Sequence, residues 1–179
     1  MLRKTLLGLA ALVIVFVIVV ALQPADFRIE RRATLNAPAS VVFTQVNDFH
    51  LWNAWSPWAK IDPAMQQSFT GAAGGKGAVY SWNGNKEVGE GRMTILDSRP
   101  SELVRINLEF IAPFKATNLT DFTFKGSGNQ TEVVWAMTGT NDFMLKAVGL
   151  FMNMDKVVGN DFERGLAQLK TVVEGTGRR

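Results

Sequence analysis

The sequence predicts an α+β domain carried on a single membrane-spanning helix. Three observations support this fold class: an uninterrupted apolar run at residues 6–22, apolar–polar alternation in seven segments between residues 27 and 139, and helical periodicity over residues 157–174. About 150 residues follow the apolar run, which suffices for one domain but not for two. We therefore divide the chain into an anchor (1–25), a domain (26–175) and a tail (176–179).

The apolar run Leu6–Leu22 is just long enough to cross a bilayer as a helix. Its 17 residues span roughly 25 Å at about 1.5 Å per residue. A cleaved signal peptide is the alternative interpretation, but Val20-Ala21-Leu22-Gln23 is a poor cleavage site. We therefore favour a single-pass membrane protein whose transmembrane helix covers about residues 5–22.

Charged residues near the apolar run predict its orientation. Arg3 and Lys4 precede the run and favour a cytoplasmic N-terminus. Arg28, Arg31 and Arg32 follow it, but they lie in a segment expected to be part of the folded domain. We therefore expect the domain outside the cytoplasm, in the periplasm if the source is a Gram-negative bacterium.

Composition excludes several classes of function. The chain has no cysteine, so disulfides, thiolate metal sites and cysteine nucleophiles are impossible. Without Arg3 and Lys4 it carries 17 basic and 16 acidic residues, with no basic stripe for nucleic acid. Residues 74–77 (Gly-Gly-Lys-Gly) lack phosphate-loop spacing, and no cluster has zinc-ligand spacing. We predict no cofactor, no metal and no nucleic-acid partner.

The domain begins with a strand at Phe27–Leu35 and two short helices. Pro38 suits the first helical position, and Val42, Phe43 and Val46 recur at helical spacing. A second short helix is predicted from about Asp48 to Ala54. Six strands follow, separated by turn-forming groups and therefore mostly paired as antiparallel hairpins: Gln67–Gly71, Gly77–Asn83, Gly89–Ser98, Leu103–Phe110, Thr117–Lys125 and Thr131–Gly139.

Helical periodicity returns after residue 141. Phe143–Asp155 is apolar on nearly every side, and Val157–Glu174 carries an apolar stripe that ends before Gly175. The last helix is the only element long enough to cover the antiparallel sheet. The methionine-rich segment Phe143–Met154 is too short to span a bilayer. It is a buried helix, a segment that lies against the membrane, or a gate to a pocket.

Four stretches resemble the helix-grip superfamily, which includes START lipid-transfer domains, plant pathogenesis-related ligand binders and polyketide cyclases/dehydrases. The closer similarity is to SRPBCC or polyketide-cyclase-like proteins with an N-terminal membrane segment. The resemblance implies a START/Bet v 1-like curved antiparallel sheet around a long C-terminal helix, with a deep apolar cavity between them. These proteins share no catalytic motif, so no catalytic residue is carried over. The matching stretches are residues 52–58 (WNAWSPW), 80–85 (YSWNGN), 88–91 (VGEG) and 159–166 (GNDFERGL).

Candidate ligand-binding residues are the aromatic and apolar side chains that alternation places on one strand face, together with the last helix and the tryptophan cluster. They are Trp52, Trp55, Trp58, Tyr80, Trp82, Met93, Ile95, Ile106, Leu108, Phe110, Trp135, Met137, Phe162 and Leu166. The tryptophans at 52, 55 and 58 form either an aromatic wall at a pocket mouth or a hydrophobic plug between helix and sheet.

Polar candidates are few. A pocket also needs a few convergent polar groups, and Tyr80, Glu109, Asn118 and Asp121 are the candidates at strand positions. The face that Asp121 takes is left open, because Leu119 and Phe122 indicate opposite parities. The weak catalytic candidates are His50, Tyr80 and Glu109. The nearest carboxylate to His50 is that of Asp48, and on a short helix these two side chains are expected to diverge.

These observations favour a membrane-anchored protein that binds a small hydrophobic or amphipathic ligand, lipid-like or polyketide- or isoprenoid-like. Binding requires no catalytic residue, which agrees with the sparse inventory. A cyclase- or dehydratase-like enzyme using the same cavity is the first alternative, and a module that binds a protein partner is the second. The sequence makes no prediction of the oligomeric state.

Overall fold

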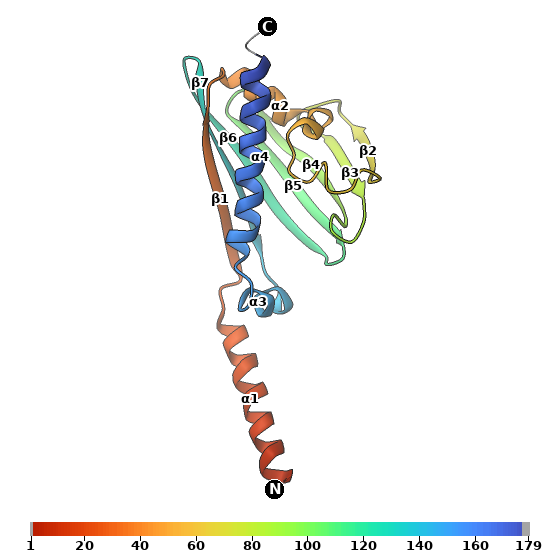
Figure 1. Cartoon of the computed structure of the whole chain (residues 1–179), viewed down its shortest axis with the longest axis vertical. Coiled ribbons are helices and arrows are strands. Elements are labelled where there is room, and N and C mark those ends of the chain that lie inside the picture. The colour runs from red at the N-terminus through yellow and green to blue at the C-terminus, as the bar shows by residue number, and fades with distance from the viewer. Residues whose placement is uncertain (1, 177–179) are drawn as a thin grey trace.

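A single seven-stranded antiparallel sheet forms the body of the domain. The computed structural model describes residues 2–176, and Figure 1 shows the sheet curling around one long helix. The strand order is β1-β7-β6-β5-β4-β3-β2, so consecutive strands from β2 to β7 are neighbours and β1 closes beside β7. The strands are β1 (Asp26–Leu35), β2 (Gln66–Gly71), β3 (Ala78–Asn83), β4 (Glu90–Arg99), β5 (Leu103–Ala112), β6 (Ala116–Ser127) and β7 (Gln130–Thr140).

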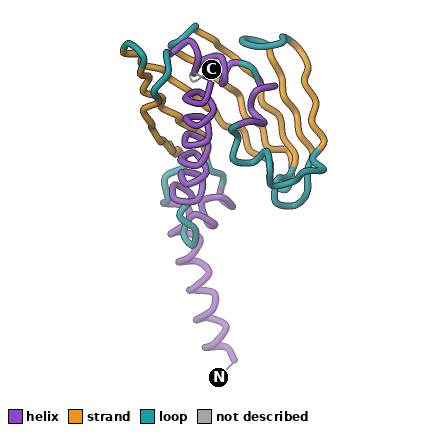
Figure 2. The backbone as a smooth tube through the Cα atoms, turned by 45° about the horizontal axis from the view of Figure 1, so that its top comes forward, coloured by secondary structure: helices purple, strands orange, loops and turns teal. Residues whose placement is uncertain are grey.

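Helices occupy the concave side of the sheet and the N-terminal end of the chain. They are α1 (Leu2–Leu22), α2 (Ala39–Asn47), the 3₁₀ helix η1 (Phe49–Ala54), α3 (Phe143–Gly149) and α4 (Met154–Thr176). α1 extends away from the domain, whereas α4 runs along β1 on the hollow side of the bent sheet (Figures 1 and 2). The predicted helix-grip architecture and α+β class are therefore confirmed.

The register of the sheet separates an inner, concave face from an outer one. Phe122 is opposite Trp135, Leu108 is opposite Met93, and directly opposed residues share a face. Following these pairs across all seven strands places the apolar residues predicted on β3 to β7 on one continuous inner face. The outer face carries ion pairs such as Arg105–Asp121 and Arg92–Glu109. The two faces thus follow the period-two alternation.

A cluster of aromatic rings joins α4 to the sheet. Phe162 of α4 stacks on Trp135 of β7, with ring centroids 4.1 Å apart and planes 8° apart. Trp55 packs edge-on against Trp135 at 5.9 Å and is fully buried. Gly165 permits this contact, because a Cβ there would lie 2.7 Å from the Trp135 ring. The missing side chain lets the helix approach the indole closely.

Arg31 attaches the N-terminal half of α4 to β1. Its guanidinium donates to Glu163 Oε1 at 2.8 Å and to Asp155 Oδ2 at 3.0 Å. The side chain crosses α4 at Gly159, where a Cβ would meet the guanidinium at 1.9 Å. Hydrogen bonding from Arg31 lowers the pKa of Asp155, so the carboxylate stays charged well below neutral pH. The ion pair between Arg31 and Asp155 is therefore lost only when acid protonates this carboxylate, whereas the hydrogen bond to the Asp155 carbonyl does not depend on it.

The joint between α1 and the domain is short and hydrogen-bonded. Three residues separate the end of α1 from β1. The Lys146 ammonium of α3 donates to the Ala21 carbonyl at 2.9 Å, which satisfies a free carbonyl at the end of α1. Val20 is fully buried at this joint. We call the end of the sheet nearest α1 the proximal end and the opposite end the distal end.

Two local expectations need correction. The predicted helix over Phe143–Asp155 is divided, because α3 ends at Gly149 and α4 begins at Met154. Asn153 causes the restart, since its side chain accepts from the Lys156 amide at 2.9 Å as a helix cap. Pro38 precedes α2 in an extended conformation instead of occupying its first turn.

The packing at Gly165 generates a stability prediction. Gly165→Ala forces a methyl group against Trp135 and should lower the free energy of unfolding by about 1–3 kcal/mol through overpacking. Gly175→Ala is the matched control: no atom lies within 4 Å of its Cβ position, so it should be neutral or stabilising by up to about 1 kcal/mol. Urea unfolding of the full chain in detergent micelles measures both. Equal effects at the two positions would contradict the close-contact interpretation.

Candidate functional site

The inner face is covered unevenly from one end to the other. At the distal end α2 packs on it, with Phe43 edge-on to Phe124 at 5.8 Å, and Val104 and Leu35 are fully buried. At the proximal end the aromatic side chains retain solvent exposure, and Phe110 is 36% exposed. On β3 to β5 the proximal part of the inner face therefore keeps partly exposed aromatic side chains, although Phe49 of η1 packs against Tyr80 there at 6.0 Å.

We define the proximal inner surface as the inner-face side chains toward this end of β3 to β7, of which Met93, Asn118, Thr120 and Met137 are buried and the others are partly exposed. Trp82 stacks beside Tyr80 with ring centroids 5.8 Å apart and meets Phe110 edge-on at 6.2 Å. Gly91 lies beneath the Trp82 ring, where a Cβ would collide with it at 2.3 Å. The whole set comprises Tyr80, Trp82, Met93, Leu108, Phe110, Asn118, Thr120 and Met137.

Polar atoms without partners occur beside this surface. Thr120 Oγ1 and Trp135 Nε1 are buried and form no hydrogen bond. A buried polar group without a partner costs about 1–3 kcal/mol, so native proteins rarely leave one unpaired without a reason. Asn118, one inner-face position nearer the proximal end than Thr120, is 8% exposed. The inner face thus carries an unpartnered hydroxyl at Thr120, an unpartnered indole N–H at Trp135 and a nearly buried amide at Asn118.

Tyr80 contributes the titratable group of this surface. Burial raises its pKa above the ordinary value of a phenol. The hydroxyl therefore stays neutral at physiological pH and can donate or accept one hydrogen bond. Among the described residues of the seven strands, the inner face holds one other titratable side chain, Arg31, which is occupied by its two carboxylates on α4.

The space directly beneath the middle of α4 is filled. Trp135 and Phe162 stack there, at the position where the resemblance implied a deep cavity. The expectation of a cavity at this position is therefore corrected. The indole N–H groups of Trp52 and Trp55 donate to carbonyls of α2, at 2.9 Å to Val46 and 3.1 Å to Gln45. These two tryptophans thus form the plug alternative, and Trp58 lies half-buried at its edge against Trp135.

Other predicted ligand-binding residues belong to the same packed interior. Ile95, Ile106, Leu166 and Phe162 are at most 2% exposed. The structure therefore separates the predicted set into a core group around Trp135 and the group of the proximal inner surface, in which Tyr80, Trp82, Leu108 and Phe110 are partly exposed. The strand residues of both groups lie on the concave face, as alternation predicted.

Glu109 and Asp121 lie on the opposite face of the sheet. Glu109 accepts from Arg92 at 2.9 Å, and Asp121 is paired bidentately with Arg105 at 2.8 Å. Their neighbours in the register are outer-face residues, so neither carboxylate reaches the proximal inner surface. Glu109 was expected to be a catalytic candidate in the cavity, but the alternation of side chains along β5 places it on the outer face, so this expectation is wrong.

His50 and Asp48 meet, although a short helix was expected to separate them. Asp48 Oδ1 lies 2.8 Å from His50 Nδ1 and also accepts from the His50 amide. Asp48 is the extended residue that caps η1, which directs its side chain back over the first turn. The imidazole stacks on Phe69 at 4.3 Å and its side chain is about half exposed, and Phe69 separates it from Tyr80, whose ring lies 5.2 Å from that of Phe69.

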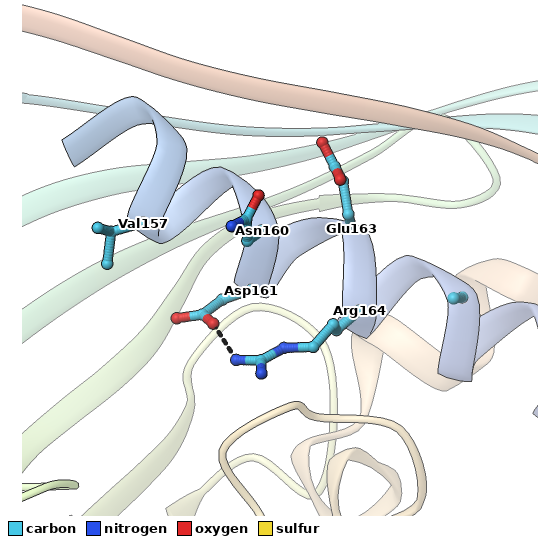
Figure 3. A pocket seen from close by; sticks show the side chains of 6 residues that line it. Val157, Asn160, Asp161, Glu163 and Arg164 are labelled. Atoms are coloured by element: carbon cyan, nitrogen blue, oxygen red, sulfur yellow. Dashed lines mark hydrogen bonds and ion pairs between the residues drawn. The ribbon is translucent and has the colours of Figure 1, made fainter. Parts of the chain in front are cut away.

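Two open recesses lie outside the inner face. The first, of about 660 Å³, is lined by α4 residues alone, and Figure 3 shows the Asp161–Arg164 ion pair within it while Glu163 points toward β1. Its charged, exposed lining does not suit an apolar ligand. The second, of about 480 Å³, lies where the end of α1 meets α3. Within residues 2–176, no three His, Cys, Asp or Glu side chains converge as a metal site requires.

Sequence reasoning missed Thr120 and the role of the Trp135 indole. A threonine flanked on its face by Asn118 and Phe122 is a signal that alternation provides, because a hydroxyl on an otherwise apolar inner face needs a partner. The unsatisfied state of the indole N–H depends on packing against α4 and has no signature in the sequence.

Comparison with solved structures finds the same fold in proteins of low sequence identity. The protein CV1439 from Chromobacterium violaceum is 15% identical with a TM-score of 0.57, covering 84% of this chain and 99% of its own. The Zhui aromatase/cyclase from Streptomyces sp. R1128 is 15% identical with a TM-score of 0.59, covering 86% and 96%. The di-domain ARO/CYC StfQ from the steffimycin biosynthetic pathway is 8% identical with a TM-score of 0.63, covering 86% and 52%.

Sequence comparison identifies the family. No curated protein matches the chain in sequence. The family model described as "Polyketide cyclase / dehydrase and lipid transport" matches residues 26–174, the whole of the folded domain. The chain therefore belongs to the polyketide cyclase/dehydrase and lipid transport family.

Proposed function

We propose that this protein is a membrane-anchored binder of a small hydrophobic or amphipathic molecule, lipid-like or polyketide-like, which is held on the proximal inner surface. The observation that carries the proposal is the occurrence, on one concave face, of partly exposed aromatic side chains toward its proximal end and of two buried polar atoms without partners. Ligand pockets combine an apolar lining with a few convergent polar groups in this way. Family membership supports the same class of function.

Desolvation of the ligand supplies the binding energy. Removing 200–300 Å² of apolar ligand surface from water contributes on the order of 5–8 kcal/mol at about 25 cal/mol per Å², before the costs of association. A hydrogen bond to Thr120 Oγ1 or Trp135 Nε1 would add to this, because the unbound state leaves both atoms unpaired. The apolar part thus sets the affinity and the polar atoms orient the ligand.

A cyclase- or dehydratase-like reaction is the second candidate function. The Tyr80 phenol favours it, since burial keeps the hydroxyl protonated beside the bound ligand. General acid–base chemistry commonly divides proton transfer between two groups within hydrogen-bond reach. Arg31, the other titratable inner-face residue among the described strands, is paired with Asp155 and Glu163. This arrangement favours binding over catalysis.

Membrane anchoring is supported by the joint at the end of α1. Along Leu2–Leu22 the apolar side chains project into solvent over nearly their whole length, which is unfavourable in water. A signal sequence would share this apolar composition. The contact from Lys146 to the Ala21 carbonyl belongs to the folded domain, and cleavage near residue 22 would remove it. We therefore infer a retained anchor, with the domain outside the cytoplasm as Arg3 and Lys4 favour.

Retention of α1 is directly measurable. We expect the purified protein to have an intact mass that includes residues 1–25 and to stay in the membrane fraction after an alkaline carbonate wash. A membrane helix of this length remains inserted under those conditions, because exposure of its apolar surface to water is costly. A mature chain that begins near residue 23 and appears in the soluble fraction would establish a signal peptide instead.

The ligand site is tested by Leu108→Glu against Asn107→Glu. The first variant places a carboxylate on the proximal inner surface, and the second places it on the outer face of the same strand. Desolvating an unpaired charge costs several kcal/mol, so Leu108→Glu should reduce ligand occupancy by more than about tenfold. Native mass spectrometry of the full chain released from detergent, followed by extraction of bound lipid, measures occupancy. Ligand that persists in Leu108→Glu at the level of Asn107→Glu would place the site elsewhere.

Thr120→Val tests the polar contact. The substitution keeps the shape but removes an unpaired hydroxyl, so the ligand-free chain should gain stability by about 1 kcal/mol. Loss of one ligand hydrogen bond should weaken affinity for the recovered ligand by roughly fivefold, the equivalent of about 1 kcal/mol. Urea unfolding and titration by native mass spectrometry give the two values. A variant with unchanged affinity would show that the hydroxyl does not contact the ligand.

A further inference from the structure

We propose that the domain docks on the bilayer through two apolar lips, α3 with the turn that follows it and the turn between β5 and β6, so that ligand passes between the membrane and the proximal inner surface without crossing bulk water. The occupant of this surface is the lipid bilayer that holds α1. The inference rests on the proposed anchoring and extends it to the contact surface and the direction of ligand exchange.

The first lip exposes an unusual amount of apolar side chain for a water-facing segment. Phe151 is 83% exposed and Met144 is 62% exposed. Four neighbouring apolar side chains are also exposed: Phe143, Val148, Leu150 and Met152. A contiguous exposed apolar patch on a soluble domain marks a contact with a partner or a membrane. Flexible methionine side chains adapt readily to the irregular packing of lipid chains.

The second lip is the tip of the β5–β6 hairpin. Phe114 is 66% exposed there, and Ile111 is exposed beside it. Lys115 follows Phe114 and is also exposed, which suits an aromatic residue at the acyl boundary with a cation at the level of the headgroups. Phe110 lies on β5 near this tip and belongs to the proximal inner surface, so it connects the second lip with the proposed ligand site.

The position of the two lips relative to α1 indicates that the bilayer is the occupant of this surface. α3 contacts the end of α1 through Lys146, so the exposed residues of α3 lie where a membrane helix leaves the bilayer. Only Gln23, Pro24 and Ala25 separate α1 from β1, a reach of at most about 10 Å. In Figures 1 and 2 the β5–β6 turn and α3 lie at the same end of the domain, the end that carries α1. The chain therefore holds both lips close to the membrane surface.

The recess at the joint has the composition of an interfacial site. Leu150, Phe151 and Met152 supply apolar walls, while Asn141, Asn153 and Lys146 supply polar groups. A lipid at the bilayer surface presents an acyl chain below and a polar headgroup above, and this recess offers complementary groups to both. The proposal therefore does not require a new conformation of α3.

The absence of cysteine permits a direct test in the full chain. Single-cysteine variants Phe151→Cys, Phe114→Cys, Phe16→Cys and Lys125→Cys each give one labelling site for an environment-sensitive fluorophore. The chains are reconstituted in vesicles of phosphatidylcholine and phosphatidylglycerol, with bromine atoms either near the headgroup or deep in the acyl chain. Lys125, exposed on the outer face near the distal end, is the control for lipid contact driven by the label.

We expect the labels at positions 151 and 114 to be quenched several-fold more by the shallow bromines than the label at position 125, and the label at position 16 to be quenched by the deep bromines. Quenching at 16 with none at 151 would overturn the docking proposal and leave the anchor intact. Loss of quenching at 16 would overturn the anchor and the docking together. Quenching at 151 with none at 114 would overturn the two-lip arrangement. If the label at 151 is unquenched, disulfide-linked dimers formed by the unlabelled Phe151→Cys chain on air oxidation would identify a second copy as the occupant.

Discussion

The stacking of Phe162 on Trp135 determines how much of the concave face α4 covers. The two rings are nearly parallel at 4.1 Å, and Gly165 on the next turn removes the side chain that would hold the helix away. Arg31 then attaches the preceding turns of α4 to β1. With α4 held along β1 by both contacts, the proximal part of β3 to β5 lies away from this helix, and its aromatic side chains stay partly exposed although Phe49 of η1 packs against Tyr80. The partly exposed surface is therefore a consequence of where α4 is bound.

The chemistry of the site follows from that coverage. Where α2, η1 and α4 pack together, indole N–H groups such as those of Trp52 and Trp55 are satisfied by backbone carbonyls. At the margin of this packing, Trp135 Nε1 and Thr120 Oγ1 are buried but unsatisfied. A polar atom in that position gains most from a ligand that brings its own donor or acceptor. The aromatic interior and the binding surface are thus two parts of one layer.

Alternation predicted the strands and their inner face because each strand crosses a sheet with one solvated side. Glu109 lies between Leu108 and Phe110 in sequence, and the same alternation that places those two residues inward directs its carboxylate outward to Arg92. The expectation that the side chains of His50 and Asp48 diverge is wrong, because the capping geometry of η1, and not regular helix spacing, sets their contact.

The partial exposure of the proximal inner surface was not predictable from the local sequence pattern. It depends on contacts between residues far apart in the chain, such as Arg31 with Glu163, and on glycines whose importance appears only when the opposing ring is known. The deep cavity implied by resemblance is filled by Trp135 and Phe162, and the apolar surface lies nearer the end of the sheet.

The position of this surface relative to α1 relates the fold to the proposed function. A ligand that is poorly soluble in water spends most of its time in the bilayer, so the slow step for a diffusing carrier is to find the membrane and extract the ligand. The proposed anchoring would raise the effective concentration of the domain at the membrane, because a short linker would confine it there. With three residues between α1 and β1, and with Phe110 and Trp82 at the sheet end that faces α1, that confinement would also orient the proposed binding surface. The same short joint limits how far the domain can travel, which suits exchange with the host bilayer or with a partner held beside it.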